Sequence, residues 1–329
     1  MNILFIGGTG NISSDCASLL HERGHQISML TRGTRPVPGQ YRSISADHAD
    51  ISAVRSALGN SEFDAAINFI GYRVPDLEID ADLLKGRIGQ YIQISTTAVY
   101  AKPHKVLPIT ESSPVGNCFS EYGQHKLACE RFLLEQCHGP DFPVTVVRPS
   151  HTYSCRWIPN PVSSTTYTVA ARMAAGKPVF VHGTGQSLWT LTHTTDFAVG
   201  LAGLIGNAKA LGEVIQITSD EVLTWNQICL ETARAIGVDS PEIIPVPIEV
   251  ICEAAPIMVG KLKGDKAEHG VFDNAKIKGL VPDFQCRTPF RDGIAKSAAW
   301  YRAHPEMMVA DPQIDAVFEA VLEAWQERS

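Results

Sequence analysis

The sequence lacks a hydrophobic run that could cross a membrane. Its longest clean apolar stretch, from Phe197 to Gly206, is about half of the roughly 20 residues that such a helix needs. It also lacks clusters of basic residues: 28 Lys and Arg stand against 35 Asp and Glu, which gives a net charge of −7. Because nonspecific binding to nucleic acid or to a membrane surface needs basic patches, we expect neither partner.

Cysteine is present without the spacing of a disulfide framework. The eight cysteines are scattered and form no Cys-x-x-Cys pair, so we expect reduced thiols and no metal site. Met1 runs directly into a strand-like segment, with no sign of a leader, and we expect a cytoplasmic protein. With 329 residues and 44% hydrophobic content, the chain has enough material for one large α/β domain or two fused lobes.

The first fifty residues contain the pattern of a dinucleotide-binding unit. An apolar run at 3–6 is followed by a glycine-rich turn at 7–13, a helical stretch and a second strand at 25–30. In such a unit the glycines let the backbone turn tightly and approach a pyrophosphate, which the helix N-terminus then binds. Ser13 replaces the third glycine of the pattern, and an ordinary strand–helix loop is the alternative. The predicted cofactor contacts are Gly7, Thr9, Gly10, Asn11 and Ile12.

The end of the second predicted strand indicates which cofactor binds. An NAD site usually has Asp or Glu there to bind the ribose 2′-hydroxyl, whereas this sequence has Arg32 and Arg35. A guanidinium can pair with a 2′-phosphate through charge-assisted hydrogen bonds, so the sequence favours NADP over NAD. The alternative is that both arginines are solvated loop charges and that Arg32 stacks on the adenine.

Tyr122 and Lys126 are the candidates for the chemistry. The segment 121–133 is predicted as a helix, on which two residues four positions apart share a face. A neighbouring ammonium favours the phenolate and lowers the pKa of the phenol, which suits tyrosine to acid–base catalysis. A hydroxyl of Ser95 or Thr96, after the strand at 91–94, would orient the substrate oxygen or the phenol. A solvated helix face is the alternative interpretation of this spacing.

Together these motifs resemble the extended short-chain dehydrogenase/reductase family, in its NAD-dependent epimerase/dehydratase branch. The resemblance implies an α/β fold, a Rossmann-like doubly wound parallel sheet with a smaller C-terminal substrate lobe. Residues 1–155 and about 190–218 would form the NAD(P)-binding domain, and about 156–189 and 219–329 the lobe. Family members are commonly homodimers, so a homodimer is also expected. The matching segments cover nearly the whole chain: 7–10, 95–100, 122–126, 147–149, 183–185, 193–196 and 272–276.

The resemblance also implies roles for individual residues. Tyr122 would be the acid and base, Lys126 would hold the nicotinamide ribose and tune the tyrosine, and Thr96 would hydrogen-bond the reacting oxygen. Asp47 would lie near the adenine. Further cofactor contacts are expected from Phe69, Ile70, Gly71, Ser95, Pro149 and His151. The implied reaction is hydride transfer at a carbinol or ketone carbon of a small sugar-type molecule, with epimerisation or keto reduction as the outcome.

Departures from the family pattern bear on the substrate. The acid pair that follows the catalytic threonine in dehydratases is replaced by Thr97 and Ala98, which disfavours a dehydratase. The arginine that grips the diphosphate of a nucleotide sugar is replaced by Trp189, which can stack on a ring but cannot neutralise a diphosphate. Arg156 or Arg172 would have to supply that charge, so a nucleotide-linked substrate stays open. The candidate substrate contacts are Thr97, Tyr153 and Trp189, with core packing as an alternative for Tyr153 and His151.

A tryptophan in this region is also found in plastid members of the family that have been associated with RNA. The alternative function is therefore a non-catalytic protein that binds RNA or a regulator on the same scaffold. Such proteins tend to lose the Tyr/Lys pair or to gain basic surface. This chain keeps Tyr122 and Lys126 and is acidic, which favours the enzyme.

Overall fold

A seven-stranded parallel sheet forms the N-terminal part of the molecule in the computed structural model, which describes residues 1–328. The strand order is β11-β6-β5-β4-β1-β2-β3, with every neighbouring pair parallel. Apart from the edge strand β3, of which only Ile44 is buried, the strands are short and mostly buried, as a covered parallel sheet requires. They are β1 (Asn2–Ile6), β2 (Gln26–Thr31), β3 (Arg42–Ser45), β4 (Ala65–Asn68), β5 (Tyr91–Ile94), β6 (Val144–Pro149) and β11 (Val214–Ile217).

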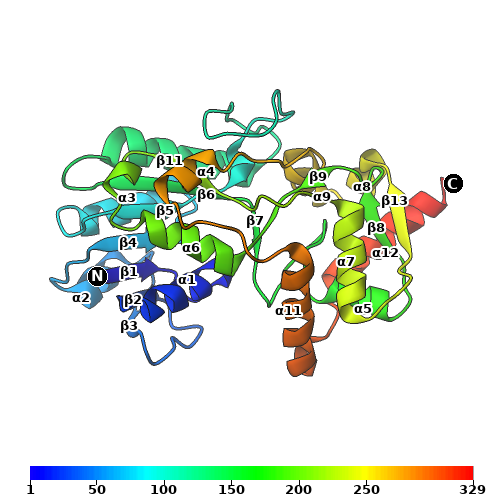
Figure 1. Cartoon of the computed structure of the whole chain (residues 1–329), viewed down its shortest axis with the longest axis horizontal. Helices are drawn as coiled ribbons and strands as arrows, with labels where there is room; N and C mark the ends of the chain where they lie inside the picture. Colours follow the sequence, from blue (N-terminus) through cyan, green and yellow to red (C-terminus); the bar gives the residue numbers. More distant parts are fainter. Residues whose placement is uncertain (329) are drawn as a thin grey trace.

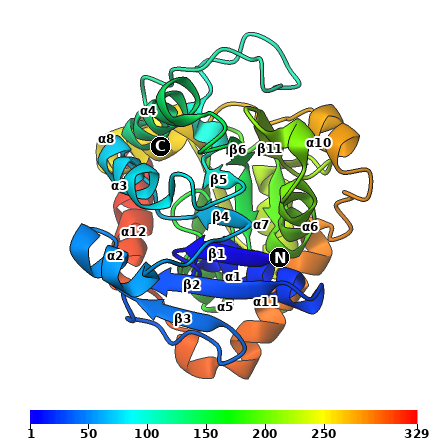
Figure 2. The same cartoon turned by 90° about the vertical axis from the view of Figure 1, so that its left-hand side faces the viewer.

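Helices cover both faces of this sheet, which confirms the doubly wound α/β fold. On one face lie α1 (Asn11–Glu22), α6 (Thr194–Leu204) and α10 (Ala275–Leu280); on the other lie α2 (Ile51–Leu58), α3 (Val74–Leu84) and α4 (Glu121–Phe132). Figure 2 looks along the layers and shows the two sets of helices on opposite sides of the fanned strands. Each set closes its own hydrophobic core against the sheet.

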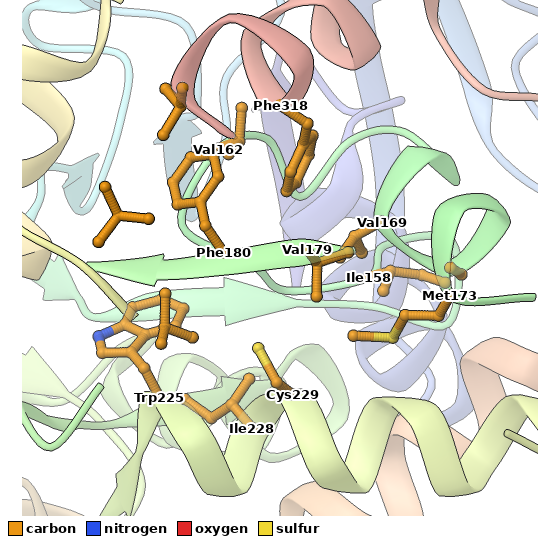
Figure 3. Close-up of a cluster of buried hydrophobic side chains, with 14 of the residues drawn as sticks. Ile158, Val162, Val169, Met173, Val179, Phe180, Trp225, Ile228, Cys229 and Phe318 are labelled. Carbon is orange, nitrogen blue, oxygen red and sulfur yellow. The ribbon is translucent and has the colours of Figure 1, made fainter. Parts of the chain in front are cut away.

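A second, smaller lobe lies beside the sheet along the long axis of the molecule (Figure 1). Its core forms where α7 and α12 pack against the β8–β13 pair, and Figure 3 shows Trp225 and Ile228 of α7 on one side of β8 and Phe318 of α12 on the other. Its strands are β8 (Val179–His182), β9 (Leu188–Trp189), β12 (Leu223–Thr224) and β13 (Ile243–Val246). Its helices are α5 (Thr168–Ala174), α7 (Trp225–Ile236), α8 (Ile248–Ala254), α9 (Met258–Lys261), α11 (Phe290–Ala303) and α12 (Pro312–Gln326).

Two connections tie the lobe to the sheet. A short parallel pair, β7 (His151–Tyr153) with β10 (Leu191–His193), lies where the chain leaves and re-enters the sheet region. Later in the chain, Ile277, Val281 and Phe284 pack in the hydrophobic core of the sheet, not that of the lobe. The segment around α10 therefore returns to the sheet, although the sequence-based division placed all of 219–329 in the lobe. Within residues 1–328, no helix is both long and apolar enough to span a bilayer.

Candidate active site

A cavity of about 460 Å³ opens at the carboxyl ends of the central strands, where parallel α/β sheets commonly bind ligands. Its lining comes from the turns after β1, β4, β5 and β6, from helix α4 and from the C-terminal lobe. Most of the predicted site residues meet here: Gly7, Gly10, Asn11, Ile12, Phe69, Ile70, Ser95, Thr96, Thr97, Tyr122, Lys126, Pro149, His151 and Trp189 all line it.

The turn after β1 is built for close approach by a ligand. Gly7 has φ +84°, and a Cβ there would lie 2.3 Å from Cγ2 of Ile70, so only glycine fits. The Ser13 hydroxyl accepts a hydrogen bond from the Gly10 backbone N–H at 2.8 Å, so the residue that replaces the third glycine holds the turn. Helix α1 then begins with no acidic side chain in its first turn, which leaves its positive end to an anion. These features fit the pyrophosphate of a dinucleotide.

Lys126 is buried without a carboxylate partner among the described residues. Its Nζ donates to the backbone oxygens of Gly71 and Ile94, both at 2.8 Å, and lies 4.7 Å from the centroid of the Tyr72 ring. The Gln93 side-chain amide donates to the same two carbonyls at 3.0 and 3.1 Å. Desolvation lowers the Lys126 pKa to about 8, because the carbonyl dipoles replace only part of the lost hydration. The third N–H of the ammonium stays available to a bound molecule.

The carbonyl that receives Lys126 is held by a buried polar network. Asn68 Oδ1 accepts from the backbone N–H groups of Ile70 and Gly71 at 2.7 and 2.6 Å. The Asn68 amide donates in turn to the buried carboxylate of Asp80, which also accepts from Tyr91 and contacts His48. Gly71 therefore lies behind the cavity wall, where it orients the lysine through its carbonyl.

Tyr122 projects into the cavity from the first turn of α4. Ser120 caps this helix by accepting from the Gly123 N–H at 3.0 Å. A Cβ on Gly123 would lie 2.4 Å from the Ala98 carbonyl oxygen, so this glycine lets the helix approach the turn after β5. Tyr122 lines the cavity and is 46% exposed, and its ring centroid lies 6.4 Å from that of Tyr72.

The expectation that the ammonium lowers the pKa of the phenol is wrong for this structure. Desolvation by the surrounding protein raises the Tyr122 pKa well above its usual value, and the nearby Tyr72 and Asp265 add to the rise. A hydrogen bond with Thr96 opposes it, whereas Lys126, whose Nζ donates to two carbonyls, is not among the groups that shift it. The phenol is therefore a protonated acid at neutral pH.

The two candidate hydroxyls after β5 have different partners. Ser95 Oγ donates to the buried Glu130 carboxylate at 2.5 Å, so its proton is committed there. Thr96 Oγ1 accepts from the Ala98 N–H at 3.1 Å, and this residue opposes the rise in the Tyr122 pKa. Of the two, Thr96 is the hydroxyl that acts on the phenol.

Besides Gly71, five predicted residues lie outside this cavity. Arg35 donates to the backbone oxygen of Thr9 at 3.2 Å, and both residues line a neighbouring cavity of about 490 Å³. Arg32 and Asp47 are exposed on the surface, where Asp47 accepts from the Ala49 N–H. Tyr153 does not reach a substrate: it is fully buried, with its ring 5.2 Å from His193 and 5.5 Å from Phe290, so the core-packing alternative describes it.

Trp189 and His151 form a fixed, neutral wall. Trp189 Nε1 donates to His151 Nδ1 at 3.1 Å, and the other ring nitrogen of His151 contacts the Ser164 hydroxyl at 2.8 Å. Burial lowers the His151 pKa to about 3, so this histidine is uncharged at neutral pH. The Trp189 ring lies 5.5 Å from that of Trp225.

The arginines proposed to replace the missing cation do not line the cavity. Arg172 is buried and bonded to Asp315 and Glu319 at 2.6 and 2.7 Å. Arg156 lines neighbouring cavities, 5.9 Å from the Trp300 ring. The cavity lining also includes residues that the sequence reasoning missed, because they come from separate segments without a motif; among them are Tyr72, Trp157, Asp265 and Lys266.

One metal-like motif occurs in the chain but does not form a metal site. Residues 21–25 have the His-Glu-x-x-His spacing of zinc-binding helices, but α1 ends at Glu22 and Gly24 turns the chain with φ +82°. His21 and His25 therefore do not share a helix face. Across the described part of the chain, no group of three or more His, Cys, Asp or Glu side chains is arranged to hold a metal ion.

The sequence and the fold were compared with those of known proteins. Residues 3–218 match the model of the NAD dependent epimerase/dehydratase family. The chain is 28% identical to the chloroplast stem-loop binding protein of 41 kDa b of Arabidopsis thaliana, over 74% of this chain and 65%, slightly less than two thirds, of that protein. It is 24% identical to the 2′-dehydrokanamycin reductase of Streptomyces kanamyceticus, over 87% and 81% of the two chains. The UDP-glucose 4-epimerase of Bifidobacterium longum, solved with NAD⁺ and UDP, has the same fold, with a TM-score of 0.73, 19% identity and coverage of 93% and 99%.

Proposed function

Because the chain belongs to the NAD dependent epimerase/dehydratase family, we propose that it is an NAD(P)H-dependent keto reductase that acts on a sugar-type ring. The nicotinamide cofactor, when bound, supplies the hydride. One observation carries the proposal: a protonated phenol and a buried ammonium line the same cavity as the glycine turn and the start of α1.

The residues of the cavity divide into cofactor and substrate contacts. Gly7, Gly10 and the free N–H groups of α1 would hold the pyrophosphate, with Asn11 and Ile12 beside it. The third N–H of Lys126 would hold the nicotinamide ribose. Arg32, exposed at the end of β2, would pair with the 2′-phosphate of NADP, whereas Arg35 is bonded to the Thr9 carbonyl. The remaining cofactor contacts would be Asp47, Phe69, Ile70, Pro149 and His151.

The chemistry of Tyr122 favours reduction over oxidation. As hydride reaches the carbonyl carbon, the C=O π electrons move to oxygen, and that oxygen takes the proton of the Tyr122 hydroxyl. A phenol whose pKa is raised is already protonated for this step, whereas oxidation of an alcohol needs the phenolate. Thr96 would hydrogen-bond the reacting oxygen, and Lys126, whose Nζ is held by the Gly71 and Ile94 carbonyls, would fix the nicotinamide ribose beside it.

Epimerisation is the second candidate, because the same residues can run hydride transfer in both directions. Relatives of this chain include proteins named UDP-glucose 4-epimerase from Neisseria meningitidis and Haemophilus influenzae. An epimerase regenerates its cofactor in each cycle and has no need to release it. A reductase must exchange oxidised for reduced cofactor after every turnover.

Cofactor occupancy distinguishes these functions. Purified protein would be denatured and the released nucleotide identified, and the intact protein would be titrated with NADPH, NADH and a stem-loop RNA by calorimetry. We expect an exchangeable site that binds NADPH. Retained oxidised cofactor would instead favour the epimerase, and tight RNA binding without nicotinamide binding would contradict both enzymatic functions.

A further inference from the structure

Part of the cavity wall belongs neither to the glycine turn nor to the catalytic residues. It consists of Tyr72, which follows β4, of Trp157 and Trp189 from the C-terminal lobe, and of Asp265 and Lys266 at the end of segment Leu262–Lys266. We call these five side chains the substrate wall. They come from four separate parts of the chain, so only the folded molecule assembles them.

The substrate wall carries no net charge. Lys266 Nζ lies 3.5 Å from the Asp265 carboxylate, so the two charges offset each other. The only other charged residue of the cavity lining is Lys126, whose Nζ is bonded to two carbonyls. A diphosphate at the substrate wall would have to leave water and enter next to the Asp265 carboxylate, where the Lys266 charge is already offset by that carboxylate.

The geometry of the wall suits a sugar ring. The Trp189 ring is locked by its hydrogen bond to His151 and by Trp225 behind it. A Cβ on Gly270 would lie 2.9 Å from two Trp189 ring carbons, so glycine at this position leaves room for the indole. Indole faces pack well against the C–H face of a sugar, and a carboxylate accepts strong hydrogen bonds from hydroxyl or ammonium groups.

Asp265 also lines the same cavity as Tyr122. Its charge is one of the groups that act on the Tyr122 phenol. A substrate group bound to the Asp265 carboxylate would thus be a neighbour of the carbonyl that receives the Tyr122 proton. Asp265 is therefore placed to select what the substrate carries beside its reacting carbon.

We infer that the substrate is a phosphate-free sugar whose ring packs on Trp157 and Trp189 and whose hydroxyl or amine groups bind Asp265. This inference rests on the proposed keto reductase function, because it describes the substrate end of the same cavity. It differs from the alternative of a nucleotide-linked sugar, which needs a diphosphate subsite.

The test compares two substrate classes on the intact protein. Wild-type protein with NADPH or NADH would be mixed with phosphate-free keto sugars (keto forms of methyl glucopyranosides, of methyl glucosaminides and of kanamycin), and in parallel with the keto forms of UDP-glucose and dTDP-glucose. Reduced cofactor would be followed by its absorbance. We expect turnover only in the phosphate-free class, and no inhibition of that turnover by UDP at millimolar concentration.

Two single substitutions test whether Asp265 recognises the substrate. Asp265→Asn should raise KM for the phosphate-free substrate at least about 10-fold with a smaller change in kcat, because the carboxylate binds a group beside the reacting carbon. Glu268→Gln, a carboxylate three residues away that does not line the cavity, is the matched control and should leave KM unchanged. An unchanged KM in Asp265→Asn would remove this residue from recognition and overturn the inference.

The outcomes separate this inference from the proposed function. Turnover or tight binding of UDP-glucose or dTDP-glucose by cofactor-loaded protein would overturn the phosphate-free substrate and leave the reductase intact. Failure of the protein to bind NADPH or NADH would overturn the proposed function itself. Cofactor binding without turnover of either class would count against both.

Discussion

Two buried charges lie one turn apart on helix α4, and the protein surrounds them differently. Glu130 is 3% exposed, and its carboxylate accepts from Arg148 through both oxygens, at 2.9 and 2.5 Å, and from Ser95. Lys126 is 2% exposed and has only backbone carbonyls as hydrogen-bond partners. The same helix thus buries one charge that is fully paired and one that keeps an unused donor.

This difference separates a structural charge from a functional one. The Glu130–Arg148 pair joins α4 to β6 and holds the Ser95 hydroxyl, and a complete set of partners makes it rigid. Lys126 is incompletely compensated, so its pKa falls to about 8 and its charge responds to any anion that forms nearby. An incompletely paired buried charge therefore identifies a functional residue more clearly than burial alone does.

The largest effect should come from breaking the paired charge. Glu130→Gln leaves the Arg148 guanidinium buried without its counter-ion, and we expect a loss of about 3–5 kcal/mol in the free energy of unfolding, measured by urea denaturation. Asp82→Asn, which breaks an exposed pair with Arg55, is the control and should cost at most about 1 kcal/mol. Equal losses in the two variants would show that the buried pair contributes no more to the free energy of unfolding than the exposed pair.

Removal of the proton donor should affect catalysis and not folding. Tyr122→Phe should lower turnover about 100-fold or more, the usual scale of acid–base catalysis, and should leave the Kd for NADPH nearly unchanged. Turnover would be measured with the substrate found in the comparison above. A variant with near-normal turnover would remove Tyr122 from the mechanism.

The incompletely paired charge should appear in the pH dependence. Lys126 has its pKa lowered to about 8, so it is charged below that pH and loses its charge as the pH rises through 8. We expect kcat/KM for keto reduction to fall above about pH 8. In Lys126→Met, kcat/KM should be about 10-fold or more lower, and its decrease above pH 8 should disappear. A decrease that persists in this variant would show that another group titrates there.

Exposed charges should give the smallest effect. Replacing Arg32 and Arg35 by Ala should weaken NADPH binding about 10-fold and leave NADH binding nearly unchanged, since only NADPH carries the 2′-phosphate. Calorimetry with the two cofactors measures the difference. Because Arg35 is bonded to Thr9, Arg32→Ala alone should account for most of it. Equal weakening of both cofactors would show that the arginines do not select NADP.

Much of this molecule could be predicted from local patterns. The glycine turn between two apolar strands and the helix at 121–133 were predicted from the sequence, and the structure has α4 at Glu121–Phe132. The structure confirms the predicted α/β fold, and the family match confirms the predicted family. These predictions succeeded because strand burial and glycine turns follow from residues adjacent in the chain. Tyr153 was predicted either to contact the substrate or to pack in the core, and its ring lies in the core beside His193 and Phe290.

By itself the sequence determined the strand–turn–helix unit, because backbone conformation and amphipathic spacing depend on near neighbours. It also determined that Tyr122 and Lys126 share a helix face. Only the tertiary structure decided the direction in which the pKa values of these two groups shift, since desolvation depends on every element packed around them. It alone also brought Trp157, Trp189 and Asp265 to one wall of the cavity, because no local pattern encodes contacts between loops so distant in the chain.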